Sequence, residues 1–274
     1  MKIYISADIE GVAGIVDWEQ CRPSGGAAWQ EGRELLTAEV NAAIEGAFLA
    51  GAESIAVNDA HGLMRTILPR QLDPRVRLVQ GRHKANYMLE GLDKSFDTMF
   101  CVGYHGGAGD RWGVLNHTYS PHATRLNGDT VDELALNAAV AGVVFDVAVS
   151  LVTGDEWTVH AARGLLGPGT IGVATKRSLG RYAADSLHPE EACRLISEGA
   201  NNAIKRAPTL LPYLVAPPFT IELDFESSAQ ADRANLMPGV ERVADRTISY
   251  AHDDMLTLYR AYQALMILAR SGEQ

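Results

Sequence analysis

The sequence predicts an α/β fold: a mostly parallel sheet flanked by helices, in a Rossmann-like three-layer arrangement, with a second, smaller two-layer α+β domain. Two observations lead to this prediction. Through roughly the first 175 residues, short apolar runs alternate with helical segments, which is typical of a parallel sheet covered on both faces. Further along the chain the order becomes helix, strand, helix, strand, helix, and this indicates a smaller α+β unit. We therefore place the two domains at residues 1–178 and 179–274.

Apolar runs of strand length predict the strands, and longer segments with apolar residues three or four positions apart predict the helices. In the first domain the predicted strands are residues 2–8, 54–58, 76–79, 98–104, 147–153 and 171–174, and the predicted helices are residues 34–50 and 132–144. In the second domain the predicted helices are residues 189–206, 229–236 and 253–269, and the predicted strands are residues 220–224 and 240–250. The stretch 22–28, rich in Gly and Ala, is expected to be a flexible surface loop.

Composition excludes several classes of function. A net charge of −10 and a pI near 5.3 argue against nucleic acid or an anionic membrane as a partner. The three cysteines lie far apart and form no CxxC pair, so neither a disulfide framework nor a thiolate zinc site is indicated. Because Asp8 and Glu10 precede any apolar segment that could form a signal peptide, we expect a cytoplasmic protein.

Two carboxylates stand at the end of the first predicted strand, in the segment Ser6 to Gly11. Asp8 and Glu10 are at positions i and i+2, so their side chains point to the same side of the strand. Two unpaired ionised carboxylates near an apolar core would each cost several kcal/mol. No Lys or Arg lies between Lys2 and Arg22 to compensate them. This pair therefore predicts a metal ion beside it, in the domain at residues 1–178.

Further candidate ligands occur where other predicted strands end. His61 follows the second strand, His105 follows the strand at 98–104, and Glu133 begins a helix. In open α/β sheets, ligands gather at the carboxyl ends of the strands, so these side chains are expected to converge. Imidazole and carboxylate together suit zinc, and also manganese, iron or cobalt. Five protein ligands exceed the usual three of one catalytic zinc, which favours two metals that share a carboxylate, with Asp8 as the natural bridge.

Several short motifs resemble the D-aminopeptidase DppA family, peptidase family M55. The motif Ser-x-Asp-x-Glu-Gly, here Ser6 to Gly11, looks like the signature of that family. The likeness continues in the same order along nearly the whole chain, through Asn58-Asp59-Ala60-His61, Gly103-Tyr104-His105, Asn116-His117, Glu133-Leu134 with Asn137, and residues 234–239.

This resemblance implies a dinuclear zinc-dependent aminopeptidase that removes N-terminal D-amino acids, such as D-Ala, from short peptides or amides. One zinc would be held by Asp8, Glu10 and His61, and the second by Asp8, His105 and Glu133. His117 would be the catalytic histidine, as a general acid or base in metal-assisted hydrolysis or, less economically, as a nucleophile. The family also implies a ring-shaped homo-oligomer, usually a decamer, with small peptides as substrates.

Two departures from a family member leave alternatives open. The loop between His105 and His117 is one residue longer here, which could alter substrate preference. Asp132 stands beside Glu133 and is an alternative ligand, although Asn137 shares a helix face with Glu133 and favours the latter.

Two other functions remain possible at this point. A metal-dependent phosphoesterase could use the same ligand set, but the few Arg and Lys residues near the ligands argue against it, because phosphate binding requires cations. A non-catalytic assembly protein of the same fold is disfavoured by the intact ligand set and His117. Lys176 could meet a substrate carboxylate, although a solvated lysine is the simpler expectation.

Overall fold

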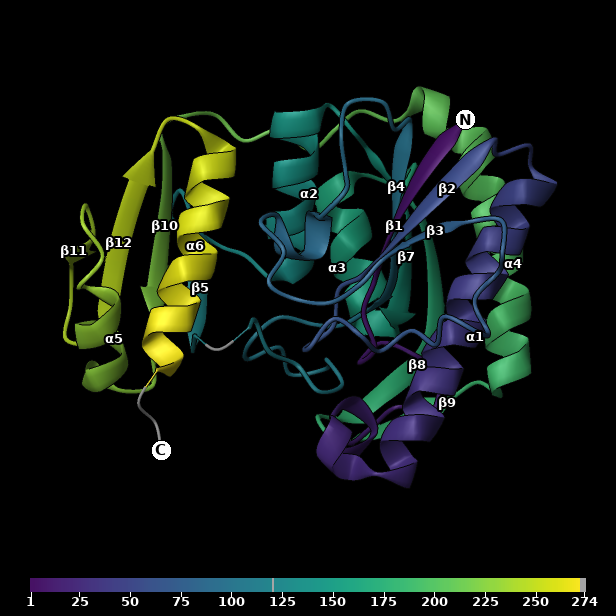
Figure 1. Ribbon diagram of the computed structural model, residues 1–274, viewed down its shortest axis with the longest axis horizontal. Coiled ribbons are helices and arrows are strands. Elements are labelled where there is room, and N and C mark those ends of the chain that lie inside the picture. Colours follow the sequence, from purple (N-terminus) through teal and green to yellow (C-terminus); the bar gives the residue numbers. More distant parts are fainter. Residues whose placement is uncertain (120, 272–274) are drawn as a thin grey trace.

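Two β-sheets organise the chain in the computed structural model, which describes residues 1–119 and 121–271 (Figure 1). The larger sheet has the strand order β3-β2-β1-β4-β7-β8-β9. Its strands are β1 (Lys2–Ala7), β2 (Ser54–Asp59), β3 (Arg77–Val79), β4 (Thr98–Tyr104), β7 (Val149–Asp155), β8 (Ile171–Gly180) and β9 (Ala183–Ser186). All neighbours pair in parallel except β8 and β9. The predicted mostly parallel sheet is confirmed.

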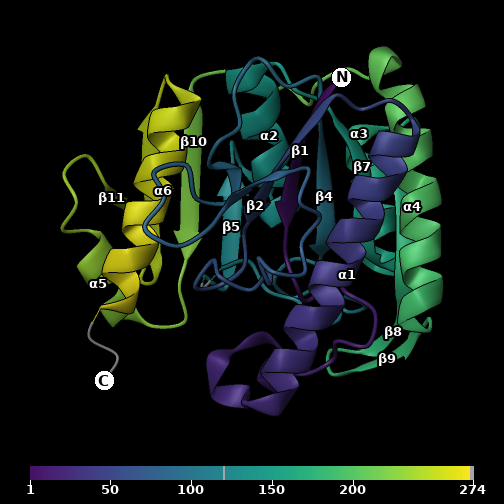
Figure 2. The ribbon, with the colours of Figure 1, turned by 45° about the vertical axis from the view of Figure 1, so that its right-hand side comes forward.

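Helices cover both faces of this sheet, as the three-layer prediction requires. The helices α1 (Ala27–Leu49) and α4 (Pro189–Arg206) lie side by side on one face (Figure 2). The helices α2 (Glu133–Phe145) and α3 (Glu156–Leu166) lie on the other face (Figure 1). The side chains of β1 alternate accordingly: Ile3 and Ile5 enter the core under α1 and α4, whereas Tyr4 enters the opposite core. The helices α1 and α4 approach so closely that a Cβ on Gly46 would lie 2.0 Å from a backbone oxygen of α4.

The second sheet is antiparallel, with the order β11-β12-β10-β5-β6. Its strands are β5 (Ala123–Leu126), β6 (Asp129–Thr130), β10 (Phe219–Asp224), β11 (Glu241–Arg242) and β12 (Thr247–His252). The helices α5 (Ser228–Ala234) and α6 (Met255–Arg270) cover this sheet, and α6 also packs against α2 (Figure 1). One continuous apolar core therefore joins the second sheet to the first.

The division between the two sheets does not coincide with the expected domain boundary at residue 178. The strand β9 and helix α4 follow that point but belong to the larger sheet, because the buried face of α4 packs on α1 and β8. The strands β5 and β6 precede it but belong to the second sheet, where Arg125 pairs with Glu222 across β5 and β10.

Several local details also differ from the sequence expectations. The helix α3 was not expected, because it follows β7 directly; the Asp155 side chain caps it by accepting from Thr158 N. The single strand expected at 240–250 is divided into β11 and β12. Among the described helices, none combines the length and apolarity needed to cross a membrane.

Candidate active site

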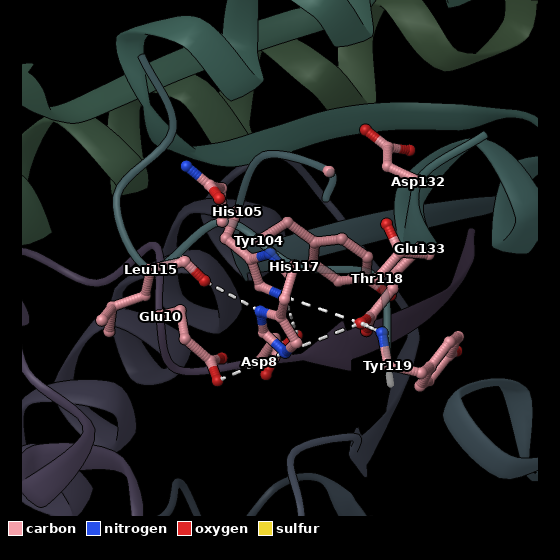
Figure 3. A network of polar contacts seen from close by, with 12 residues as sticks. Asp8, Glu10, Tyr104, His105, Leu115, His117, Thr118, Tyr119, Asp132 and Glu133 are labelled. Atoms are coloured by element: carbon pink, nitrogen blue, oxygen red, sulfur yellow. Dashed lines mark hydrogen bonds and ion pairs between the residues drawn. The ribbon is translucent and has the colours of Figure 1, made fainter. Parts of the chain in front are cut away.

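The five predicted metal ligands converge at the carboxyl edge of the larger sheet. Figure 3 shows four of them, Asp8, Glu10, His105 and Glu133. Asp8 and Glu10 follow β1, His61 follows β2, His105 follows β4, and Glu133 opens α2. Because parallel strands end on one edge of the sheet, the three loops after β1, β2 and β4 meet there, and the start of α2 joins them.

A close approach of two backbones brings the β1 loop to the end of β4. Gly11 N donates to Gly103 O at 2.9 Å, and a Cβ on Gly11 would lie only 1.9 Å from Tyr104 O. Only glycine fits at this position. The contact holds Asp8 and Glu10 over His105, which directly follows Tyr104.

Asp8 lies between two groups of potential ligands. Asp8, Glu10 and His61 form one group, and Asp8, His105 and Glu133 form another; in each, the ligand atoms lie within 4.8 Å of one another. Asp8 Oδ1 is 3.0 Å from His61 Nδ1, whereas Asp8 Oδ2 is 3.5 Å from His105 Nε2. The two oxygens of one carboxylate therefore face different histidines, which is the arrangement that a bridging ligand needs.

Backbone carbonyls fix the orientation of both histidines. His61 Nε2 donates to Cys21 O at 2.8 Å, which leaves Nδ1 facing Asp8 and Glu10. His105 Nδ1 donates to Gly106 O at 2.9 Å, which leaves Nε2 facing Asp8 and Glu133. Metal-binding histidines are typically held in this way, with the second ring nitrogen bonded to a carbonyl or carboxylate.

Unsatisfied polar atoms show that the cluster fits a cation. Both carboxylate oxygens of Glu10 and Nε2 of His105 are buried without a hydrogen-bond partner among the described residues. Burying such atoms unpaired is costly, and a metal ion would satisfy them. A donor set of carboxylate oxygens and imidazole nitrogens suits zinc and related transition metals.

The pKa values of the cluster residues also indicate that the cluster suits a cation. Burial alone would raise the pKa of Asp8, but the neighbouring imidazoles of His105 and His61 lower it well below its usual value. Burial opposes protonation of His61 and His105, yet the neighbouring carboxylates raise the pKa of each imidazole well above its usual value. Burial raises the pKa of Glu133. The negative charge of the carboxylates is thus compensated by protons on the imidazoles, and a bound metal ion can take the place of these protons.

His117 lies against this cluster, with one ring nitrogen turned to it (Figure 3). Its Nδ1 donates to Leu115 O at 2.8 Å, and its ring stacks on His105 with the centroids 4.1 Å apart. Its Nε2 lies 3.8 Å from Glu133 Oε1 and 4.0 Å from Glu10 Oε1. Burial, and then the charge of His105, lowers the pKa of His117 well below its usual value. His117 also forms a potential ligand group with Glu10 and His105.

The tip of the β8–β9 hairpin supports the loop that carries His117. Leu115 N donates to Arg181 O at 2.8 Å, and the Arg181 side chain donates to Asn116 O at 3.1 Å. Leu115 itself has a φ of 50°, in the left-handed region. The position of His117 therefore depends on a hairpin distant in sequence.

Asp132 lies outside every ligand group found in the described residues. Its side chain accepts from Ala135 N at 2.7 Å and caps α2, whereas Glu133 turns toward the cluster and accepts from Tyr119 N at 2.7 Å. The geometry supports Glu133 over Asp132. The Asn137 side chain bonds to the hydroxyls of Tyr104 and Tyr259.

Lys176 is buried, contrary to the expectation of a solvated lysine. Its Nζ donates to the carbonyls of Glu10, Val12 and Ile15 at 2.6, 2.8 and 2.6 Å. Burial lowers its pKa to about 8. The sequence does not reveal this burial, because the three acceptors lie on the β1 loop, far from Lys176 along the chain. Lys176 ties the β1 loop together beneath the ligands.

We expect Lys176→Met to destabilise the protein by about 3 kcal/mol or more, because three carbonyl acceptors would lose their donor. The free energy of unfolding, measured by urea denaturation, checks this expectation. Lys205→Met, at an exposed position of α4, is the control and should change stability by less than about 0.5 kcal/mol. Equal stabilities of the two variants would contradict the bracing role of Lys176.

A cavity of about 550 Å³ opens over the cluster. Aromatic side chains form part of its wall, namely Trp18, Trp29, Tyr87 and Tyr119. Three arginines also line it: Arg22, Arg82 and Arg270. The expectation of few cations near the ligands was therefore wrong, because loops distant in sequence bring these arginines to the site. The stretch 22–28 is also not simply a loop: it contains the 3₁₀ turn Pro23–Gly25 and the first two residues of α1.

The fold and the cluster together define a class: an α/β enzyme with a carboxylate–histidine centre at the carboxyl edge of a parallel sheet. The chain belongs to peptidase family M55, the D-aminopeptidases, whose family model matches residues 1–264. It is accordingly a hydrolase of peptide or amide bonds.

Two comparisons with individual proteins agree with this assignment. The chain is 34% identical over 271 residues to a D-aminopeptidase of Bacillus subtilis (strain 168), covering 98% of this chain and 96% of that protein. A solved structure described as the Zn-dependent D-aminopeptidase DppA from Bacillus subtilis, a self-compartmentalizing protease, superposes with a TM-score of 0.95 at 33% identity. That match covers 100% of both chains, so it includes both sheets.

Proposed function

We propose that this protein is a dinuclear zinc-dependent aminopeptidase that removes N-terminal D-amino acids of the D-Ala type from short peptides or amides. The observation that carries the proposal is the placement of Asp8, whose Oδ1 faces His61 and whose Oδ2 faces His105. A relative of 33% identity with the same fold is described as Zn-dependent.

In this proposal Asp8, Glu10 and His61 would hold one zinc, and Asp8, His105 and Glu133 would hold the other. When bound, the zinc ions would polarise the scissile carbonyl and supply an acidified water as the nucleophile. The chain provides the ligands in fixed orientations, since the carbonyls of Cys21 and Gly106 lock the two imidazoles.

His117 would act as the general acid or base of the reaction. Because its Nδ1–H is donated to Leu115 O, the lone pair of the neutral ring is on Nε2, the atom that faces the cluster. A base at this position can accept a proton on Nε2 and return it to the leaving amine. Direct attack by Nε2 on the substrate is the less economical alternative.

We propose that the subunits form a ring-shaped homo-oligomer, with ten copies as the expected number, in the cytoplasm. The solved relative is described as self-compartmentalizing. Large apolar side chains that are exposed in the single chain, such as Leu211 and Leu236, are available for such contacts. The molar mass in solution, measured by light scattering, tests the ring.

One assay tests the proposed reaction. Purified protein is analysed for metal and then incubated with the p-nitroanilides of D-Ala and L-Ala and with p-nitrophenyl phosphate. We expect about two zinc ions per chain, in keeping with a two-metal centre, and chelator-sensitive hydrolysis of the D-Ala compound. Substoichiometric metal, or no D-Ala hydrolysis, would contradict the proposal, and preferential phosphate release would favour the phosphoesterase instead.

A further inference from the structure

Arg22 holds a defined place beside the proposed reaction centre. Its guanidinium carbon lies 4.6 Å from the centroid of the Trp18 ring, and that ring lies edge-on to His117 with the centroids 5.1 Å apart. The preceding residue, Cys21, accepts the hydrogen bond from His61. The segment that carries Arg22 is thus fixed to the site at two points, and stacking on Trp18 restrains its side chain.

The positive charge of Arg22 is not neutralised by the cavity wall. The acidic side chains that line the cavity are Asp8, Glu10 and Glu133, all of them committed to the metal cluster. No carboxylate of the described residues forms an ion pair with Arg22 or with Arg82 on the same wall. With metal ions on the cluster, the cavity would have a surplus of positive charge. Such a site favours an anionic group on the ligand.

The position of Arg22 limits where that anionic group lies. The two ring contacts place its guanidinium within about 10 Å of the His117 ring. A carboxylate one residue beyond the scissile bond can bridge this span, because an extended residue covers about 3.5 Å and each hydrogen bond about 3 Å. In a dipeptide, the group at that point is the C-terminal carboxylate.

We propose that Arg22 binds the C-terminal carboxylate of the substrate and thereby makes dipeptides with a free carboxyl group the preferred substrates. This inference rests on the proposed function and adds the part of the substrate beyond the scissile bond. A guanidinium pairs with a carboxylate through two parallel hydrogen bonds, which fixes the direction of the dipeptide as well as its charge. Arg22 is then a specificity-determining residue.

Matched substrates test the inference. D-Ala-D-Ala and D-alanyl-D-alaninamide have nearly the same shape, and only the first bears a carboxylate. We expect the wild-type enzyme to favour D-Ala-D-Ala in kcat/KM by about tenfold or more, the scale of one charge-assisted hydrogen bond. In Arg22→Gln this preference should be lost, chiefly through a higher KM for D-Ala-D-Ala. Arg22→Lys, which keeps the charge but not the paired geometry, should restore part of it.

Controls separate this inference from the proposed function. Arg246→Gln, an exposed change in the connection between β11 and β12, should keep the wild-type preference. Equal use of acid and amide by the wild-type enzyme, or an equal loss for both substrates in Arg22→Gln, would overturn the role of Arg22 while leaving the aminopeptidase intact. Faster turnover of p-nitrophenyl phosphate than of D-Ala-D-Ala would overturn it too. No hydrolysis of any D-Ala compound would overturn the proposed function and, with it, this inference.

Discussion

Replacing Asp8 with alanine is expected to remove both zinc ions and to lower kcat/KM by roughly 10⁴-fold or more, since metal assistance supplies several kcal/mol of transition-state stabilisation. Asp8 is the shared member of both ligand groups, and each of its oxygens faces a different histidine. Zinc content by mass spectrometry after desalting, together with D-Ala p-nitroanilide kinetics, measures both effects.

Glu10→Ala is the matched variant for this prediction. Glu10 is in the group with His61 but not in the group with His105 and Glu133, so its loss should chiefly remove one ion. An Asp8→Ala protein that keeps one zinc at wild-type affinity would show that Asp8 does not bridge. Loss of both ions from Glu10→Ala would show that the two sites are not separable in the way the geometry indicates.

Replacing His117 with alanine should lower kcat by about 10²- to 10⁴-fold, the usual worth of a general acid or base, while the zinc content stays near that of the wild type. The reason is that His117 Nε2 faces the cluster from outside the two groups that share Asp8. Paired measurements of kcat and zinc content check this expectation.

The outcome for the metal decides between two roles of His117. His117 also forms a potential ligand group with Glu10 and His105, in which the ligand atoms lie within 4.8 Å of one another. If His117→Ala loses zinc in proportion to its activity, His117 is a ligand and the proposed division of roles is wrong. Circular dichroism of the variant excludes unfolding as the cause of either result.

Short apolar runs and repeats in the sequence predicted most of the strands and helices that position the candidate ligands. The strand at 98–104 and the helix at 189–206 have the expected bounds, because an apolar run and a regular apolar repeat are both visible within a short window. The convergence of Asp8, His61 and His105 also followed from a general rule, that parallel strands end on one edge. That rule requires no knowledge of side-chain contacts.

Long-range contacts account for what the sequence did not reveal. The strand β5 is short, and it belongs to the second sheet only because it pairs with β10, almost a hundred residues away. Lys176 and Arg22 are similar cases: nothing in their immediate neighbours shows that one is buried beneath the ligand loop and that the other lines the cavity. Contacts with residues distant in sequence decide which sheet a short strand joins and whether a charged side chain is buried or lines a cavity.

The bridging of two zinc ions by Asp8 is tested most directly by anomalous X-ray diffraction from crystals of the zinc-bound protein, recorded above and below the zinc absorption edge. We expect two anomalous peaks about 3.5–4 Å apart, one beside Asp8 Oδ1 with Glu10 and His61, and the other beside Asp8 Oδ2 with His105 and Glu133. A single peak, or two peaks of which only one contacts Asp8, would contradict it.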